Sequence, residues 1–125
     1  MRARSLVATT MTWMLASCAA SAARGGAARA VLTQEQLAAT NSQNVYEAVE
    51  KLRPEWLTSR GPTSVTDPTP TVASVYTGGT MLGKADYLRE MRILDVTEVR
   101  YWNAGQASAR FGMGHPRGVI EIVRR

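Results

Sequence analysis

The sequence predicts a small α/β domain of the α+β kind, in which short strands and short helices follow one another along one chain. Three observations predict this class. Apolar residues recur at helical spacing in the first half of the chain, and β-branched segments bounded by glycines recur in the second half. The length of 125 residues suffices for one modest core. A barrel of many strands or a two-domain enzyme does not fit this length.

The first helix is predicted to follow Leu32 and to run to about Ala39. Thr33, with Gln36 three residues later, forms a capping-box pattern. Leu32 and Leu37 occupy the positions of a hydrophobic staple, which packs the residue before the cap against the first turns. Order in the chain is therefore expected to begin here.

A second helix is predicted from four apolar residues at positions i, i+3, i+4 and i+7, which are Val45, Ala48, Val49 and Leu52. Asn41 and Ser42 offer its N-cap. Glu47 and Lys51 form an i, i+4 pair of opposite charge on the solvent side. Pro54 is expected to end the helix, because the residue before a proline disfavours helical backbone.

The chain beyond this helix is expected to leave regular structure. Trp56 and Leu57 should fold back as a lid on the core. The segment from Thr58 to Thr71 holds three prolines and a glycine among serines and threonines, which predicts a long exposed loop.

A β-hairpin is predicted next. The segment Val72–Thr77 is β-branched and aromatic, Gly78-Gly79 is a two-residue turn, and Thr80–Leu82 provides the returning strand. Gly83 is expected to separate this strand from a short helical stretch around residues 86–91.

The last part of the chain predicts two more strands around a short helix. Thr97–Trp102 is the first strand, Ala104–Phe111 a helix of small residues, and Val119–Val123 the final strand with its isoleucines inward. The glycines of Gly112–Gly118 permit a tight turn before the final strand.

No pattern of active-site residues emerges. Gly112–Gly118 has the spacing G-x-G-x-x-x-G and leads into a strand, whereas the dinucleotide-binding fingerprint must open a helix. His115 is expected to be an exposed loop residue, and no serine lies in a G-x-S-x-G elbow. Asp86 and Glu90, one helical turn apart, are typical of a solvated face. A single Cys and a single His cannot supply the roughly four ligands of a structural zinc site. We therefore expect no enzymatic activity, metal or cofactor.

The amino terminus has the pattern of an export signal. Arg2 and Arg4 precede an apolar run from Ser5 to Ala16, which is shorter than the roughly 20 residues that span a bilayer. Leu15-Ala16-Ser17-Cys18 resembles the bacterial lipobox. On this interpretation residues 1–17 are a lipoprotein signal peptide, and Cys18 becomes the acylated first residue and the membrane anchor. The alternatives are an ordinary secretory signal cut nearby and an uncleaved cytosolic helix.

The segment after Cys18 is expected to be a flexible tether over residues 18–30, followed by one domain over residues 31–125. Loss of residues 1–17 would leave 108 residues with 13 basic and 10 acidic side chains. The charged residues that remain are spread along the chain without a run of five charges of the same sign, which disfavours nucleic-acid binding. Ala19 favours outer-membrane retention by the rule for enteric lipoproteins. We expect the domain to face the periplasm. Exposure at the cell surface is the open alternative.

The second half of the chain resembles the plug domain of TonB-dependent outer-membrane receptors. The resemblance rests on Asp95–Trp102, on the ending Ala109-Arg110-Phe111-Gly112, and on Gly118–Arg124. Val75–Gly79 also fits the family's strand and tight turn. The match covers about residues 72–124 and implies a plug-like mixed sheet of three to four strands flanked by short helices.

In that family a 22-stranded barrel follows on the same chain, whereas this sequence ends at Arg125. No convincing TonB-box peptide lies between residues 18 and 31. A stand-alone plug-like module is therefore expected.

These observations favour a non-enzymatic outer-membrane lipoprotein that binds another envelope component, such as a TonB-dependent receptor. Exposed loops on a rigid scaffold are the usual place for recognition, so the expected contact residues are Arg60, His115 and Arg117. The alternative is a periplasmic small-ligand binder with Trp56, Tyr76 and Trp102 as its pocket. A third hypothesis is a passive envelope component without a specific ligand.

Overall fold

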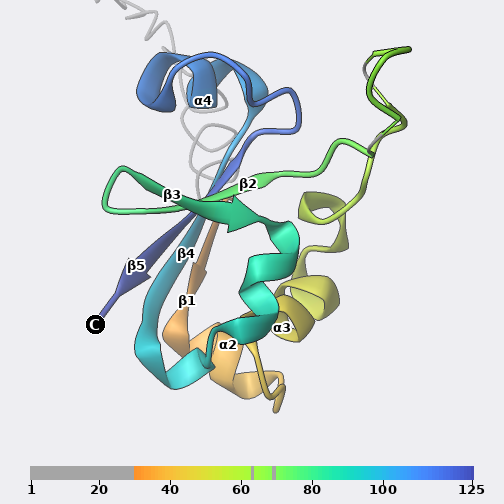
Figure 1. The fold of residues 1–125 in the computed structure, drawn as a ribbon. Coiled ribbons are helices and arrows are strands. Elements are labelled where there is room, and N and C mark those ends of the chain that lie inside the picture. The colour runs from red at the N-terminus through yellow and green to blue at the C-terminus, as the bar shows by residue number, and fades with distance from the viewer. Residues whose placement is uncertain (1–29, 63, 69) are drawn as a thin grey trace, which may run out of the picture.

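The fold is α+β, with one mixed sheet of five strands that does not close into a barrel (Figure 1). The computed structural model describes residues 30–125 apart from 63 and 69. The strand order is β1-β4-β5-β2-β3, and β2 and β5 are the one parallel pair within it. The strands are β1 (Val31–Thr33), β2 (Ser74–Thr77), β3 (Thr80–Lys84), β4 (Val96–Trp102) and β5 (Val119–Arg124).

Most of the helices cover one face of this sheet. They are α2 (Gln34–Ala39), α3 (Val45–Leu52) and the 3₁₀ helices η1 (Pro54–Trp56), η2 (Ala85–Glu90) and η3 (Ile93–Asp95). Leu37, Val49 and Leu88 from these helices are fully buried against the strands. Val99, Ile120 and Ile122 supply the sheet side. We call this aliphatic cluster the main core, and its burial is the principal favourable term in folding.

Helix α4 (Ala104–Phe111) covers part of the opposite face. Tyr76, Ala107 and Val119 are buried there, with Trp102 and Phe111 partly buried beside them. We call this group the α4 cluster. Successive residues of a strand point to opposite faces, so Val75 enters the main core while Tyr76 enters the α4 cluster.

The predicted caps and helix ends agree with the structure in most places. Thr33 and Gln36 form the expected capping box of α2, and α3 ends at Leu52, with Arg53 as its C-cap before Pro54. The N-cap of α3 is Asn44, so the prediction of Asn41 and Ser42 was wrong.

The predicted Glu47–Lys51 contact is also absent among the described residues. Glu47 instead accepts hydrogen bonds at the start of its own helix, from the Gln43 backbone amide and the Asn44 side chain. Lys51 reaches back to the carbonyl oxygen of Thr40. The helix N-terminus and its unpaired amides attract a carboxylate, which explains why Glu47 turns toward it.

The sheet has more strand residues than predicted. Val31–Thr33 forms β1, because Val31 lies opposite Arg100 and Leu32 opposite Val99 in an antiparallel ladder. Gly83 lies inside β3, opposite Val75, rather than separating the strand from the next helix. The described residues of the loop over 58–71, which leave out 63 and 69, contain no helix or strand apart from one bridge between Arg60 and Thr71, as predicted.

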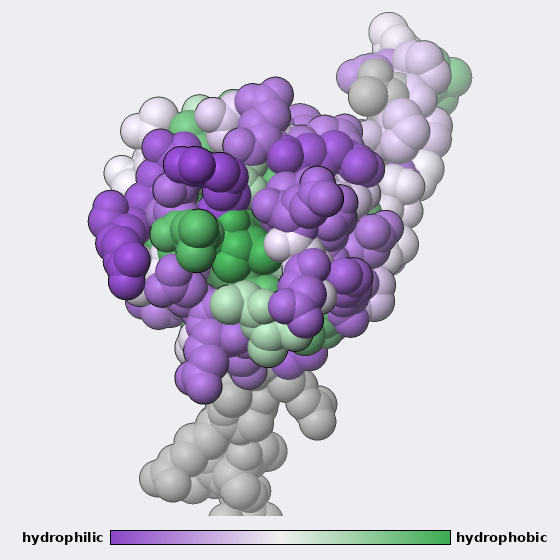
Figure 2. Space-filling model, turned by 90° about the horizontal axis from the view of Figure 1, so that it is seen from below, coloured by the Kyte–Doolittle hydropathy of each residue, from purple (hydrophilic) through white to green (hydrophobic). Residues whose placement is uncertain are grey.

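One end of the molecule exposes apolar surface. Figure 2 views the molecule from this end and shows a compact apolar area bordered by hydrophilic residues. Leu94, on the turn η3 that precedes β4, is 71% exposed. The carboxyl end of β5 lies beside this turn, where the Arg125 amide donates to the carbonyl oxygen of Asp95.

The predicted signal peptide (1–17), the lipid anchor at Cys18 and nearly all of the tether lie outside the described residues. The described part begins at Ala30, whose carbonyl oxygen accepts a hydrogen bond of 2.7 Å from the Tyr101 amide. The chain therefore enters the fold at the edge of the sheet, beside β4.

Candidate functional site

Two loops that are far apart in the sequence meet at one place on the surface. The guanidinium of Arg117 donates to the Thr58 carbonyl oxygen from Nε at 3.2 Å and from Nη2 at 2.7 Å. Within the first loop, Arg60 and Thr71 exchange two backbone hydrogen bonds of 2.9 Å each. The loops over residues 58–71 and 112–118, predicted separately as contact surfaces, therefore form one structure.

A groove of about 720 Å³ lies between these loops and the start of the β2–β3 hairpin. We call it the loop groove. Prolines from both loops line it, together with one cationic and two anionic side chains. Its lining residues are Asp67, Pro70, Thr71, Val72, Lys84, Asp86, Gly114 and Pro116.

His115 lies beneath this groove and is buried, so the prediction of an exposed His115 was wrong. Its Nε2 lies 3.1 Å from the Tyr76 hydroxyl oxygen, and its Nδ1 lies 3.2 Å from the Ser74 Oγ. The Tyr76 and His115 rings also meet edge to face, with 5.3 Å between centroids. Gly114 and Pro116 line the groove on either side of this histidine. His115 therefore fastens the groove wall to β2.

The Ser74–His115 contact has the residue types of a nucleophile and its base. Ser74 is only 1% exposed, however, and the second His115 nitrogen is already occupied by Tyr76. Lys84 Nζ donates to the Ser74 Oγ at 3.4 Å from the groove side. In this arrangement the hydroxyl has no room for a substrate, and the cluster serves as a polar fastening in which each member has a partner.

The other two predicted contact residues remain at the surface. Arg60 is exposed on the first loop, and Arg117 is half-buried because it ties the loops together. Two apolar side chains also project from these loops without cover. Val65 is fully exposed and Met113 is 93% exposed.

The three aromatic residues predicted as a ligand pocket do not meet. Trp56 lies in the main core and stacks on Tyr101, with 5.3 Å between centroids and 12° between planes. Tyr76 and Trp102 lie in the α4 cluster on the other face of the sheet. The five-stranded sheet separates them, so a pocket lined by all three does not form.

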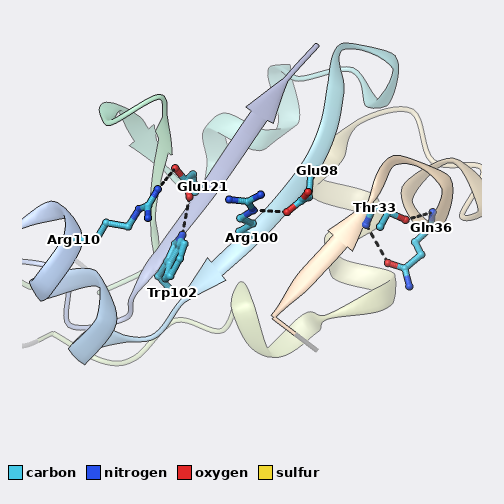
Figure 3. Close-up of polar contacts among 7 residues, drawn as sticks. All are labelled: Thr33, Gln36, Glu98, Arg100, Trp102, Arg110 and Glu121. Carbon is cyan, nitrogen blue, oxygen red and sulfur yellow. Dashed lines mark hydrogen bonds and ion pairs between the residues drawn. The ribbon is translucent and has the colours of Figure 1, made fainter. Parts of the chain in front are cut away.

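A line of polar contacts crosses the α4 side of the sheet (Figure 3). Glu121 is buried, and its carboxylate accepts from Trp102 Nε1 at 2.9 Å and from Arg110 Nη2 at 3.4 Å. The Arg110 guanidinium also lies over the Trp102 ring, 4.7 Å from its centroid. The sequence signal for this contact is the single carboxylate within the apolar strand Val119–Val123, which the sequence analysis did not use.

The same polar line continues along β4 to Arg100 and Glu98 (Figure 3). Arg100 donates to Glu98, and this hydrogen bond raises the pKa of the Arg100 guanidinium, with a smaller contribution from the charge of Glu121. Arg100 lies opposite Glu121 in the β4–β5 register. Charges of alternating sign therefore compensate one another along this face.

In the comparisons with known proteins, no family model and no curated protein matches the chain. Across the described residues, no group of three or more His, Cys, Asp and Glu side chains is placed to hold a metal ion. No helix of the described part has the length and apolarity to cross a membrane.

Proposed function

We propose that this protein is a non-enzymatic, lipid-anchored envelope protein whose plug-like domain binds another outer-membrane or periplasmic protein through the loop groove. The observation that carries the proposal is the fastening of two loops around one groove by Arg117 and His115. A surface whose loops are already held in place loses little conformational entropy on binding.

The exposed apolar residues favour a protein as the occupant of the loop groove. Val65 and Met113 stand on the two loops, each within two residues of a groove-lining position. A small ligand would fill the groove and leave both side chains in water. A protein surface would bury them, and such apolar anchors supply much of the affinity at interfaces.

The anchor in this proposal is Cys18, which the lipobox resemblance supplies. Its test is Cys18→Ala in the full chain, followed by fractionation of cells. The processed variant should leave the membrane fraction, and continued membrane association of a processed, unlipidated chain would contradict the anchor.

The binding site is tested by replacing Met113 or Val65 with a photo-crosslinking amino acid in the full-length protein, in its own envelope. Both positions should give the same crosslinked envelope protein, identified by mass spectrometry. Leu94 is the matched control, because it is also apolar and exposed but lies on η3, beside the carboxyl end of β5.

The product should also weaken when Lys84→Glu changes the charge within the groove. Equal yields of one product from all three crosslinker positions would indicate random collision and would overturn the groove proposal. The absence of any crosslinked product from position Met113 would also overturn the groove proposal.

A further inference from the structure

The apolar end of the molecule combines a projecting side chain with an adjacent hollow. The hollow has a volume of about 340 Å³ and lies between η2 and the carboxyl end of β5. Tyr87, Met91 and Leu94 are its apolar lining residues, and Leu94 is 71% exposed. We call this surface the Leu94 patch.

The two walls of this hollow carry charges of opposite sign. Glu90 lies on the η2 wall, and Arg124 and Arg125 lie on the wall formed by the end of β5. Within the described residues none of these three side chains has an ion-pair partner, although neighbouring charges do. Arg92 binds Asp95 with hydrogen bonds of 3.0 and 3.3 Å, and Arg89 binds Asp86 at 3.5 Å.

A patch of this kind is complementary to itself. Under a twofold axis, a contact from residue i to residue j is repeated from j to i. Glu90 of one copy would face Arg124 and Arg125 of the second copy, and the reverse contact would form at the same time. Each Leu94 would then lie against the hollow of the other copy and leave water, which is favourable for an apolar side chain.

We infer that the Leu94 patch is the contact surface of a twofold-symmetric dimer of this chain. An anionic lipid surface fits less well, because Glu90 and Asp95 would then be brought to a surface of their own sign. The inference is independent of the proposed partner at the loop groove, because no residue lines both surfaces, although η2 contributes Asp86 to the groove and Glu90 to the patch.

The first test places a cysteine at the patch in the full-length protein expressed in its own envelope. Leu94→Cys should give a disulfide-linked dimer on a non-reducing gel, because Leu94 itself lines the hollow that the Leu94 of the second copy enters, so the two copies of position 94 lie side by side. Met113→Cys is the control for an equally exposed position, and the chain without a new cysteine controls for Cys18. Dimer from Met113→Cys in equal amount would overturn the inference.

The second test uses charge reversal in the Leu94→Cys background. Glu90→Arg alone places arginines opposite arginines, and the pair Arg124→Glu with Arg125→Glu places glutamates opposite glutamates. Each variant alone should lose most of its disulfide-linked dimer. Co-expression of the two variants with different tags should restore a mixed dimer, since both of its charge contacts are then of opposite sign.

Failure of the mixed dimer to form would overturn the twofold arrangement, as would undiminished dimer from either variant alone. A Leu94 crosslink to a different protein would assign the patch to another partner and also overturn it. Leu94→Asp separates this outcome from the groove proposal. It should abolish co-purification of two differently tagged copies of the chain and leave crosslinking from Met113 unchanged.

Discussion

The two faces of the sheet are stabilised in different ways. The main core is built from aliphatic side chains of several helices and strands, and its members are nearly all inaccessible to water. The α4 cluster has few buried residues and adds directional contacts, such as those of Glu121 and of His115. Apolar burial has no preferred direction, whereas hydrogen bonds fix orientation.

This difference separates stability from the geometry of the candidate site. The main core should determine whether the domain folds. The polar contacts on the α4 side should determine where the Gly112–Gly118 loop lies. Four predictions, in decreasing order of expected effect, test this division.

Leu88→Ala should have the largest effect, because Leu88 is fully buried in the main core. We expect a loss of about 4 kcal/mol in the free energy of unfolding, measured by urea denaturation. Phe111→Ala, in the partly exposed edge of the α4 cluster, should cost less than half as much. Equal losses of unfolding free energy in the two variants would show that the two faces of the sheet contribute equally to stability.

Gly118→Ala should come second, because Gly118 has a φ of +80° and lies where β5 leaves the loop. A Cβ atom there would meet the Trp102 carbonyl oxygen at 2.2 Å. Strain and overlap together should cost about 3 kcal/mol.

Gly114→Ala is the control for Gly118→Ala, since Gly114 has a φ of +101° but open space around it. It should cost about 1 kcal/mol from backbone strain alone. A thermal unfolding comparison in which Gly114→Ala is the more damaging variant would contradict this assignment.

Tyr76→Phe should have a smaller effect on stability and a clear effect on the loop. It removes the hydroxyl partner of His115 and should cost about 1–2 kcal/mol. Amide hydrogen exchange in Gly112–Gly118 should accelerate more than exchange in α3. Unchanged exchange in the loop would show that His115 does not fasten it.

The smallest effects should come from removing one cap on each side. Thr33 caps α2 and Asn103 caps α4, each with a capping box. Thr33→Ala and Asn103→Ala should each cost about 1 kcal/mol locally.

Hydrogen exchange should separate the two cap variants. We expect α4 to open on its own in Asn103→Ala, because it buries little more than Ala107. We expect α2, which buries Leu37 in the main core, to open only when the whole domain unfolds. Local opening of α2 without local opening of α4 would contradict the assignment of stability to the main core.

Local patterns were sufficient for most elements of the fold. The helical spacing that ends in Leu52, the Gly78-Gly79 turn and the alternation in Thr97–Trp102 each depend on neighbours in the sequence, and each is found in the structure. Strand β1 was missed because Val31–Thr33 is too short to show alternation. Its strand character depends on pairing with β4, almost 70 residues away by its register with Arg100.

The candidate site was harder to predict for the same reason. Gly114-His115-Pro116 has the local pattern of an exposed turn, yet His115 is buried by Ser74 and Tyr76, which lie 41 and 39 residues earlier. Trp56 and Trp102 were grouped by residue type, although the sheet separates them. Residue type alone carries no information about which face of a sheet a side chain occupies.

The separation of these two tryptophans has a practical consequence for observing the protein. Within the described part of the chain, Trp56 lies on one face of the sheet and Trp102 on the other. Trp102 lies beside a carboxylate and a guanidinium, whereas Trp56 is stacked on a tyrosine ring. Fluorescence from variants that keep one or the other would follow each face separately. The domain thus carries its own pair of reporters, one for the main core and one for the α4 cluster.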